Sequence, residues 1–112
     1  QYGISLHQPP FDQYEHEISS PTQYSQSQQL GSAMRASAVE IFEYPSARDP
    51  QKGICAGLFT ARALRDKQPK NMSQWLCETA ANEVLFKPLG SNTIISFPLD
   101  SFLADDKLPM PA

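Results

Sequence analysis

The two cysteines are the first residues whose chemistry could define a function. Cys55 and Cys77 are too far apart for a C-x-x-C motif, so neither a thioredoxin-like centre nor a zinc ribbon is predicted. Each falls in a predicted core segment of a small protein, which allows one disulfide. Such a disulfide would stabilise the fold by roughly 3 kcal/mol, because it restricts the unfolded chain. Two packed thiols are the alternative. No histidine accompanies either cysteine in its segment, so we expect no catalytic thiol.

Histidine and carboxylate side chains come together near the N-terminus. His16 stands between Glu15 and Glu17, and His7 precedes them. These side chains could bind a metal ion, but the stretch has no predicted rigid geometry. We therefore expect a solvated acidic segment, with no metal and no other cofactor.

Motifs that identify large enzyme families do not occur in the sequence. It contains no G-x-G-x-x-G, P-loop, H-E-x-x-H or G-x-S-x-G pattern. Serine, histidine and aspartate are present, but no spacing groups them into a catalytic triad. The sequence therefore predicts that the protein is not an enzyme.

One basic stretch could contact an acidic partner. It consists of Arg62, Arg65, Lys67 and Lys70. The stretch has no interleaved aromatic residues, and the whole chain carries a net charge of −3, so nucleic-acid binding is not expected. No apolar run approaches the ~18 residues of a membrane span.

Asn71-Met72-Ser73 is an N-x-S triplet, which makes Asn71 a candidate for glycosylation in a secreted protein. The sequence given starts at Gln1, which agrees with removal of a targeting segment or cleavage of a polyprotein. The sequence does not assign a compartment, although an exported or organelle-processed protein fits these two features.

The elements that would position these residues fall into two regions of different composition. Residues 1–33 carry three acids and no Lys or Arg, and they hold most of the glutamines. Prolines interrupt this region and its apolar residues show no regular period, so it predicts an extended arm that cannot fold alone. Its spaced aromatic residues would anchor it to a neighbouring chain; they are Tyr2, Phe11, Tyr14 and Tyr24.

The remaining chain predicts a small globular domain over residues 34–104, followed by a C-terminal tail over 105–112. Alternating β-forming residues predict strands over 36–44 and 93–99. Residues 54–65 fit a strand or a helix, and we favour the strand because Gly57 disfavours a helix. Residues 72–86 predict a helix, capped near Asn71 and stopped by Pro88.

This order predicts an α+β fold, a small antiparallel sheet with one helix behind a long N-terminal arm. An all-β meander, with a strand in place of the helix, is the alternative. The function predicted is a non-enzymatic structural or accessory subunit of a larger assembly, which uses its arm to bind another protein subunit. Two other hypotheses remain: an exported binding module stabilised by a disulfide, and an inhibitor that inserts its arm into a partner's cleft.

Overall fold

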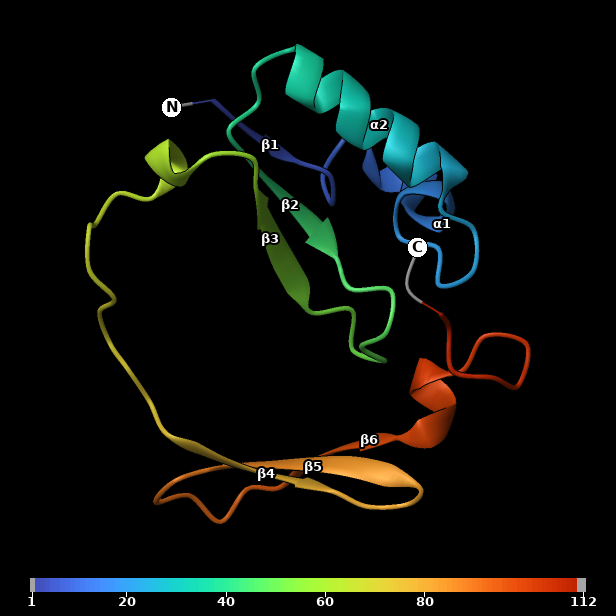
Figure 1. The fold of residues 1–112 in the computed structure, drawn as a ribbon, viewed down its shortest axis with the longest axis vertical. Helices are drawn as coiled ribbons and strands as arrows, with labels where there is room; N and C mark the ends of the chain where they lie inside the picture. The colour runs from blue at the N-terminus through green and yellow to red at the C-terminus, as the bar shows by residue number, and fades with distance from the viewer. Residues whose placement is uncertain (1, 111–112) are drawn as a thin grey trace. The chain divides into compact units, whose positions relative to one another are not determined.

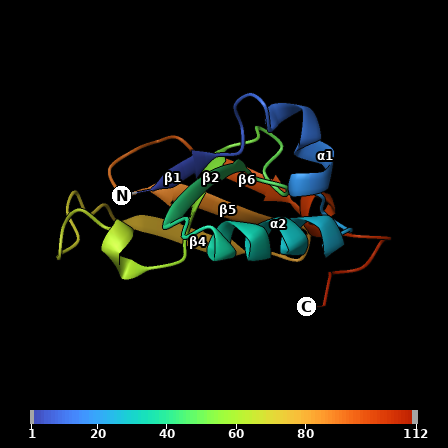
Figure 2. The same cartoon turned by 90° about the horizontal axis from the view of Figure 1, so that it is seen from above.

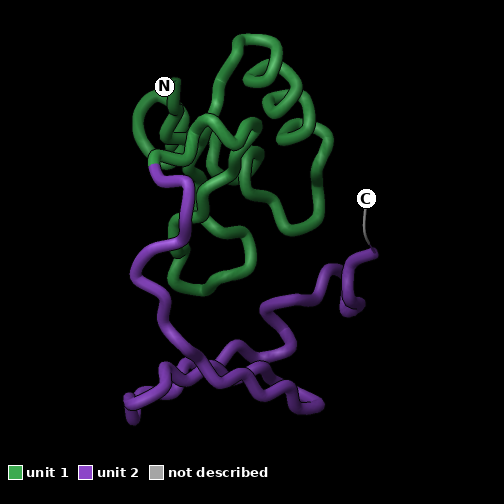
Figure 3. The backbone as a smooth tube through the Cα atoms, turned by 60° about the vertical axis from the view of Figure 1, so that its left-hand side comes forward, with its two compact units in different colours: residues 1–65 green, residues 66–112 purple. Residues whose placement is uncertain are grey.

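The chain forms two compact units, residues 1–65 and residues 66–112 (Figure 3). The structure is a computed structural model that describes residues 2–110. Each unit contains one three-stranded sheet, and unit 1 also contains two α-helices (Figure 1). The predicted α+β class is therefore confirmed. The boundary between the units falls inside the globular domain predicted for residues 34–104.

Unit 1 is built on a mixed sheet with the order β1-β2-β3. The strands are β1 (Gly3–Ser5), β2 (Ile41–Pro45) and β3 (Ile54–Leu58). β1 runs parallel to β2, with Ser5 opposite Glu43, and β3 runs antiparallel to β2, with Cys55 opposite Tyr44. The first residues of the chain are thus an integral edge of this sheet.

The two helices of unit 1 pack against its sheet. They are α1 (Glu15–Ile18), which follows the 3-10 turn η1 (Asp12–Tyr14), and α2 (Ser25–Ala36). α1 and α2 lie side by side (Figures 1 and 2). Leu6, Met34 and Val39 form the buried centre, and partly buried apolar side chains surround them: Ile4, Phe11, Ile18, Leu30, Phe42, Tyr44 and Phe59.

The extended N-terminal arm is not confirmed by this structure. Residues 1–33 contain β1, α1 and most of α2, and Leu6 is among the most buried side chains of the protein. The prolines of this region lie in its loops. The run from Ser25 to Ala36 has no β-branched residue, so it can be helical. The composition of residues 1–33 suggests disorder because part of the core that stabilises this region, including Met34 and Val39, lies later in the chain.

Unit 2 is an antiparallel meander with the order β4-β5-β6. The strands are β4 (Trp75–Thr79), β5 (Glu83–Pro88) and β6 (Ile95–Pro98), followed by the 3-10 turn η3 (Leu99–Phe102). Cys77 lies opposite Phe86, and Phe86 lies opposite Ile95. Among residues 66–110 every side chain is exposed or only partly buried.

The helix predicted for residues 72–86 is wrong, because this segment forms β4, a turn and β5. Its apolar residues also fit a period of two, and Trp75, Thr79, Val84 and Phe86 favour strands. Asn71 does not cap a helix, since its φ of 54° is left-handed. The favoured strand in 54–65 is confirmed over Ile54–Leu58, and the strand in 93–99 is confirmed as β6. The strand predicted over 36–44 begins only at Ile41.

Candidate partner-binding surface

The four aromatic residues predicted to bind a partner are all placed in unit 1. Phe11 packs against the core. Tyr2 joins β1 to the segment before β2, because its main-chain N–H donates to Glu40 Oε2 at 3.1 Å. The Tyr24 hydroxyl donates to the Pro21 carbonyl at 3.0 Å. These contacts hold the N-terminal residues to their own unit, and a role for the four residues in partner binding stays a prediction.

A small cavity of about 220 Å³ lies between the η1–α1 segment and α2. Tyr14, which is half exposed, and Phe11 line one part of it, and Leu30 of α2 lines another. Two of the predicted anchors therefore face the unit's own helix.

The predicted basic stretch is divided between the two units. Arg62 belongs to the 3-10 turn η2 (Ala61–Ala63), and Arg65 ends unit 1, whereas Lys67 and Lys70 belong to unit 2. Lys70 Nζ lies 2.9 Å from Asp66 Oδ1, and both side chains are exposed. Among the acidic N-terminal residues, Glu15 pairs with a cation of its own unit, since its Oε1 lies 3.1 Å from Lys52 Nζ.

Three polar side chains meet on the exposed side of the β1–β2 ladder. Ser5 Oγ donates to Glu43 Oε2 at 2.9 Å, and His7 Nε2 lies 3.3 Å from the same oxygen. These hydrogen bonds, first from Ser5 and then from His7, hold the pKa of Glu43 below its ordinary value. The serine bonds to the carboxylate and not to the imidazole, so the cluster lacks the relay of a hydrolytic triad.

The loop after β2 is held in place by a serine and an arginine, Ser46 and Arg48. Ser46 Oγ accepts hydrogen bonds from the main-chain N–H groups of Arg48 and Asp49, at 3.3 and 3.1 Å. Arg48 Nη2 donates to the Pro21 carbonyl at 2.8 Å. The loop is thereby tied to the segment that precedes α2. The pattern Ser-x-Arg-Asp-Pro was the available signal, since serine followed by Asp-Pro favours a turn.

The two faces of the unit 2 sheet differ in chemistry, because side chains alternate along each strand. One face carries only Thr79 as a polar side chain among its paired strand residues, which are Trp75, Cys77, Thr79, Val84, Phe86, Pro88, Ile95 and Phe97. Phe86 and Phe97 contact each other edge to face at 5.9 Å. The side chain of Trp75 is 50% exposed. We call this the aromatic face.

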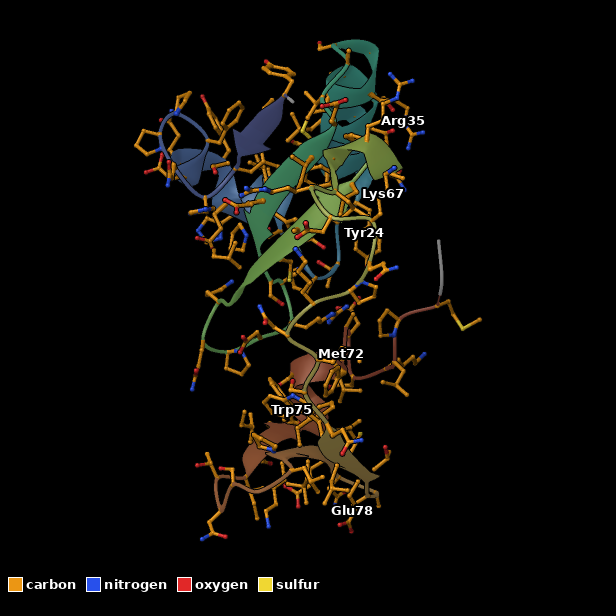
Figure 4. The ribbon with its side chains drawn as sticks, turned by 90° about the vertical axis from the view of Figure 1, so that its left-hand side faces the viewer. Tyr24, Arg35, Lys67, Met72, Trp75 and Glu78 are labelled. Atoms are coloured by element: carbon orange, nitrogen blue, oxygen red, sulfur yellow. The ribbon has the colours of Figure 1, made fainter. Side chains whose placement is uncertain are left out.

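The other face mixes leucines with charged residues and is hollowed. A groove of about 400 Å³ over this face is lined by Leu76, Glu78, Leu85 and Lys87 and by Ile94, and it is also bordered by Cys77 and Phe86, whose side chains belong to the aromatic face. Leu76 is 57% and Ile94 is 62% exposed. Trp75 and Glu78 lie on opposite sides of the sheet (Figure 4). The groove and the aromatic face together form the largest set of exposed apolar side chains that either sheet presents.

The sequence predicts a helix over most of β4 and β5 and does not indicate a binding surface there. The available signal was the alternation of Trp75, Cys77 and Thr79 with Leu76 and Glu78, followed by a turn and a second β-forming run. Asn71, the candidate for glycosylation, is exposed, and its modification stays a prediction.

Cys55 and Cys77 are free thiols in the structure and belong to different units. A disulfide between them would join the two units, and it stays a prediction. Burial raises the pKa of Tyr44, and the neighbouring Cys55 raises it further.

Within residues 2–110, no group of three or more His, Cys, Asp or Glu side chains is placed to hold a metal ion. No helix in this part of the chain is long and apolar enough to cross a membrane.

Comparison with known proteins identifies the family. No curated protein matches the chain in sequence. The model of the RES domain matches residues 3–88, which is most of the 112 residues. The match runs across the boundary between the units and ends with the last residue of β5. The chain therefore belongs to the RES-domain family.

Proposed function

We propose that this RES-domain chain is an accessory module that binds another protein chain through the sheet of unit 2. The observation that carries the proposal is the contrast between a sheet rich in apolar residues and the lack of any buried residue within 66–110. A sheet with an apolar face must bury that face against another element to form a stable domain. A partner that covers the groove or the aromatic face would supply that packing.

Removing the N-terminal residues would not test this proposal. Deletion of residues 1–30 removes β1 and Leu6, so it would unfold the core of unit 1 whether or not a partner binds. The proposal also does not depend on the absence of catalysis, which stays a prediction.

The proposal is tested by placing a photo-crosslinking amino acid at Leu76 in the full chain, expressed in its native host. Leu64 of unit 1 is a matched control, because it is a leucine of similar exposure, 60% against 57%. We expect a covalent adduct with a second polypeptide from position 76, at least tenfold above the adduct from position 64. Equal adducts at both positions, or none at position 76, would contradict the proposal.

A further inference from the structure

The cavity of about 220 Å³ in unit 1 has an apolar floor that belongs to the core. It lies between the η1–α1 segment and α2. Phe11, Ile18 and Leu30 line it, and all three are partly buried because they also pack against the core cluster of this unit. Since the core holds these side chains in place, the floor needs little rearrangement when a ligand binds, which lowers the cost of binding.

The rim of the cavity consists of three exposed polar side chains, which are Tyr14, Glu17 and Gln26. Tyr14 and Glu17 are three residues apart along η1 and α1, and Gln26 lies four residues before Leu30 on α2. Residues at these spacings share one side of a helix. Within residues 2–110, none of the three side chains forms a hydrogen bond or an ion pair. Their polar groups are therefore open to a ligand.

Charge selects the kind of ligand. Among the described residues that line the cavity, Glu17 alone is charged. Lys52, a cation that reaches α1, is already paired with Glu15, since its Nζ lies 3.1 Å from Glu15 Oε1. An unpaired carboxylate favours a positively charged group, and the ring faces of residues such as Phe11 and Tyr14 attract the same charge.

The volume and the floor limit the rest of the ligand. Sites that bury drug-sized ligands have volumes of about 300–1,000 Å³, so this cavity holds a smaller molecule. Because its floor is made of one aromatic and two aliphatic side chains, that molecule carries an apolar group beside its charge.

We propose that unit 1 binds a small organic ammonium ion in this cavity. The ammonium group donates hydrogen bonds to the Glu17 carboxylate and to the Gln26 side-chain oxygen, with the ring of Tyr14 beside it. The aromatic or alkyl group of the ligand covers the floor. This site goes beyond the proposed function, because it takes a small molecule and lies in the other unit. For a ligand of this size we expect a Kd of about 1 mM.

The test titrates the full chain with phenethylammonium and follows the methyl signals of Ile18 and Leu30 by NMR. Phenethyl alcohol has the same skeleton without the charge, and phenylacetate has the same ring with a negative charge. We expect the ammonium ion to shift both methyl signals to saturation, the alcohol to bind about fivefold more weakly, and phenylacetate to cause no saturable shift. The methyl signals of Leu76 in unit 2 are the control for general apolar binding and should not follow the same curve.

Two variants test the rim directly. Glu17→Gln removes the carboxylate and should weaken phenethylammonium binding about fivefold, while binding of the alcohol is unchanged. Glu78→Gln is the matched control, because it removes the same charge at an exposed position of unit 2. Tyr14→Leu removes the ring and should weaken the ammonium ion about threefold. Tyr2→Leu is its control, since Tyr2 is similarly exposed, 52% against 48%, and does not line the cavity.

The rim side chains are exposed and form no side-chain bonds within residues 2–110, so these variants should keep the fold, which circular dichroism checks. The inference is overturned if the alcohol binds as tightly as the ammonium ion, or if Glu17→Gln and Glu78→Gln bind it equally well. Leu76 signals that move as much as those of Leu30 would also overturn it, because they would show general apolar binding. Selective loss of ammonium binding in Glu17→Gln supports it. The crosslink from position 76 tests the proposed function separately, so either can fail without the other.

Discussion

Two sheets of three strands in one chain show how much of a protein's stability depends on what covers a sheet. Unit 1 has helices packed beside its sheet and buries Leu6 to 2% exposure. Unit 2 has a comparable set of apolar residues on its strands, yet Leu76 remains 57% exposed. Strand pairing satisfies the main-chain groups between neighbouring strands in both sheets, but among the described residues buried side chains occur only in unit 1.

This difference locates the free energy that is available for binding. Burying a leucine side chain contributes roughly 1.5–3 kcal/mol. Unit 1 gains that contribution when it folds. Unit 2 gains most of it only when another surface covers the sheet, which is why we place the partner there.

Truncating one leucine in each unit should give the largest difference in the free energy of unfolding between the two units. Leu6→Ala should lower the free energy of unfolding of unit 1 by about 3 kcal/mol, because it opens a cavity in the core. Leu76→Ala should cost less than about 1 kcal/mol, since its side chain already contacts water. Urea unfolding followed by circular dichroism measures both. Equal losses would show that the two units do not differ in packing.

A pair of glycines tests the packing of unit 1 more finely. A Cβ at Gly57 would overlap the ring of Phe42, so Gly57→Ala should destabilise by about 1–3 kcal/mol. Gly31, inside α2, has no atom within 4 Å of the added carbon, and Gly31→Ala should stabilise by about 0.5–1 kcal/mol. Thermal melts of both variants give the two signs. A destabilised Gly31→Ala variant would contradict the described position of α2.

The sequence predicted the strands whose residues alternate within one local run, namely Ile54–Leu58 and Ile95–Pro98. It did not predict that residues 1–33 fold, because Leu6 is buried against Met34 and Val39 from a later part of the chain. Local composition carries no information on such distant packing. The helix prediction for residues 72–86 is wrong for another reason, since the apolar spacing of this segment fits both a helix and two short strands.

The candidate surface lies in a part of the chain where the sequence did not indicate one. The sequence indicated protein binding, but assigned it to aromatic residues that the fold uses in unit 1, such as Phe11. The exposed residues of the unit 2 sheet were assigned to a core, because a single sequence shows apolar character and not exposure. The meeting of Ser5, His7 and Glu43 depends on the parallel pairing of β1 with β2, which no local pattern reveals.

The contact between α2 and the sheet of unit 1 gives a smaller expected effect. The Arg35 guanidinium lies 4.8 Å from the centre of the Phe59 ring. Arg35→Gln removes the cation and should lower the free energy of unfolding by about 0.5–1 kcal/mol. Arg35→Lys is the control, because it keeps a cation and should lose less. If both variants match the unchanged protein in urea unfolding, this contact does not help to hold α2.

The smallest effect concerns the Ser5–His7–Glu43 cluster at the exposed edge of unit 1. Its hydrogen bonds hold the pKa of Glu43 below 4.5 in the folded protein. A carboxyl group with a lowered folded pKa contributes stability above its unfolded pKa and loses it as pH falls through the folded value. The stability difference between the unchanged protein and Glu43→Gln should therefore be constant above about pH 5 and shrink below pH 4.5.

Ser5→Ala removes the hydrogen bond that lowers the pKa of Glu43 most, so it should weaken this pH dependence while keeping its sign. Added salt should weaken the pH dependence further, because the carboxyl group is exposed. Urea unfolding from pH 3 to pH 7 measures the difference. A difference that grows as pH falls would mean that the cluster stabilises the protonated carboxyl group and not the carboxylate.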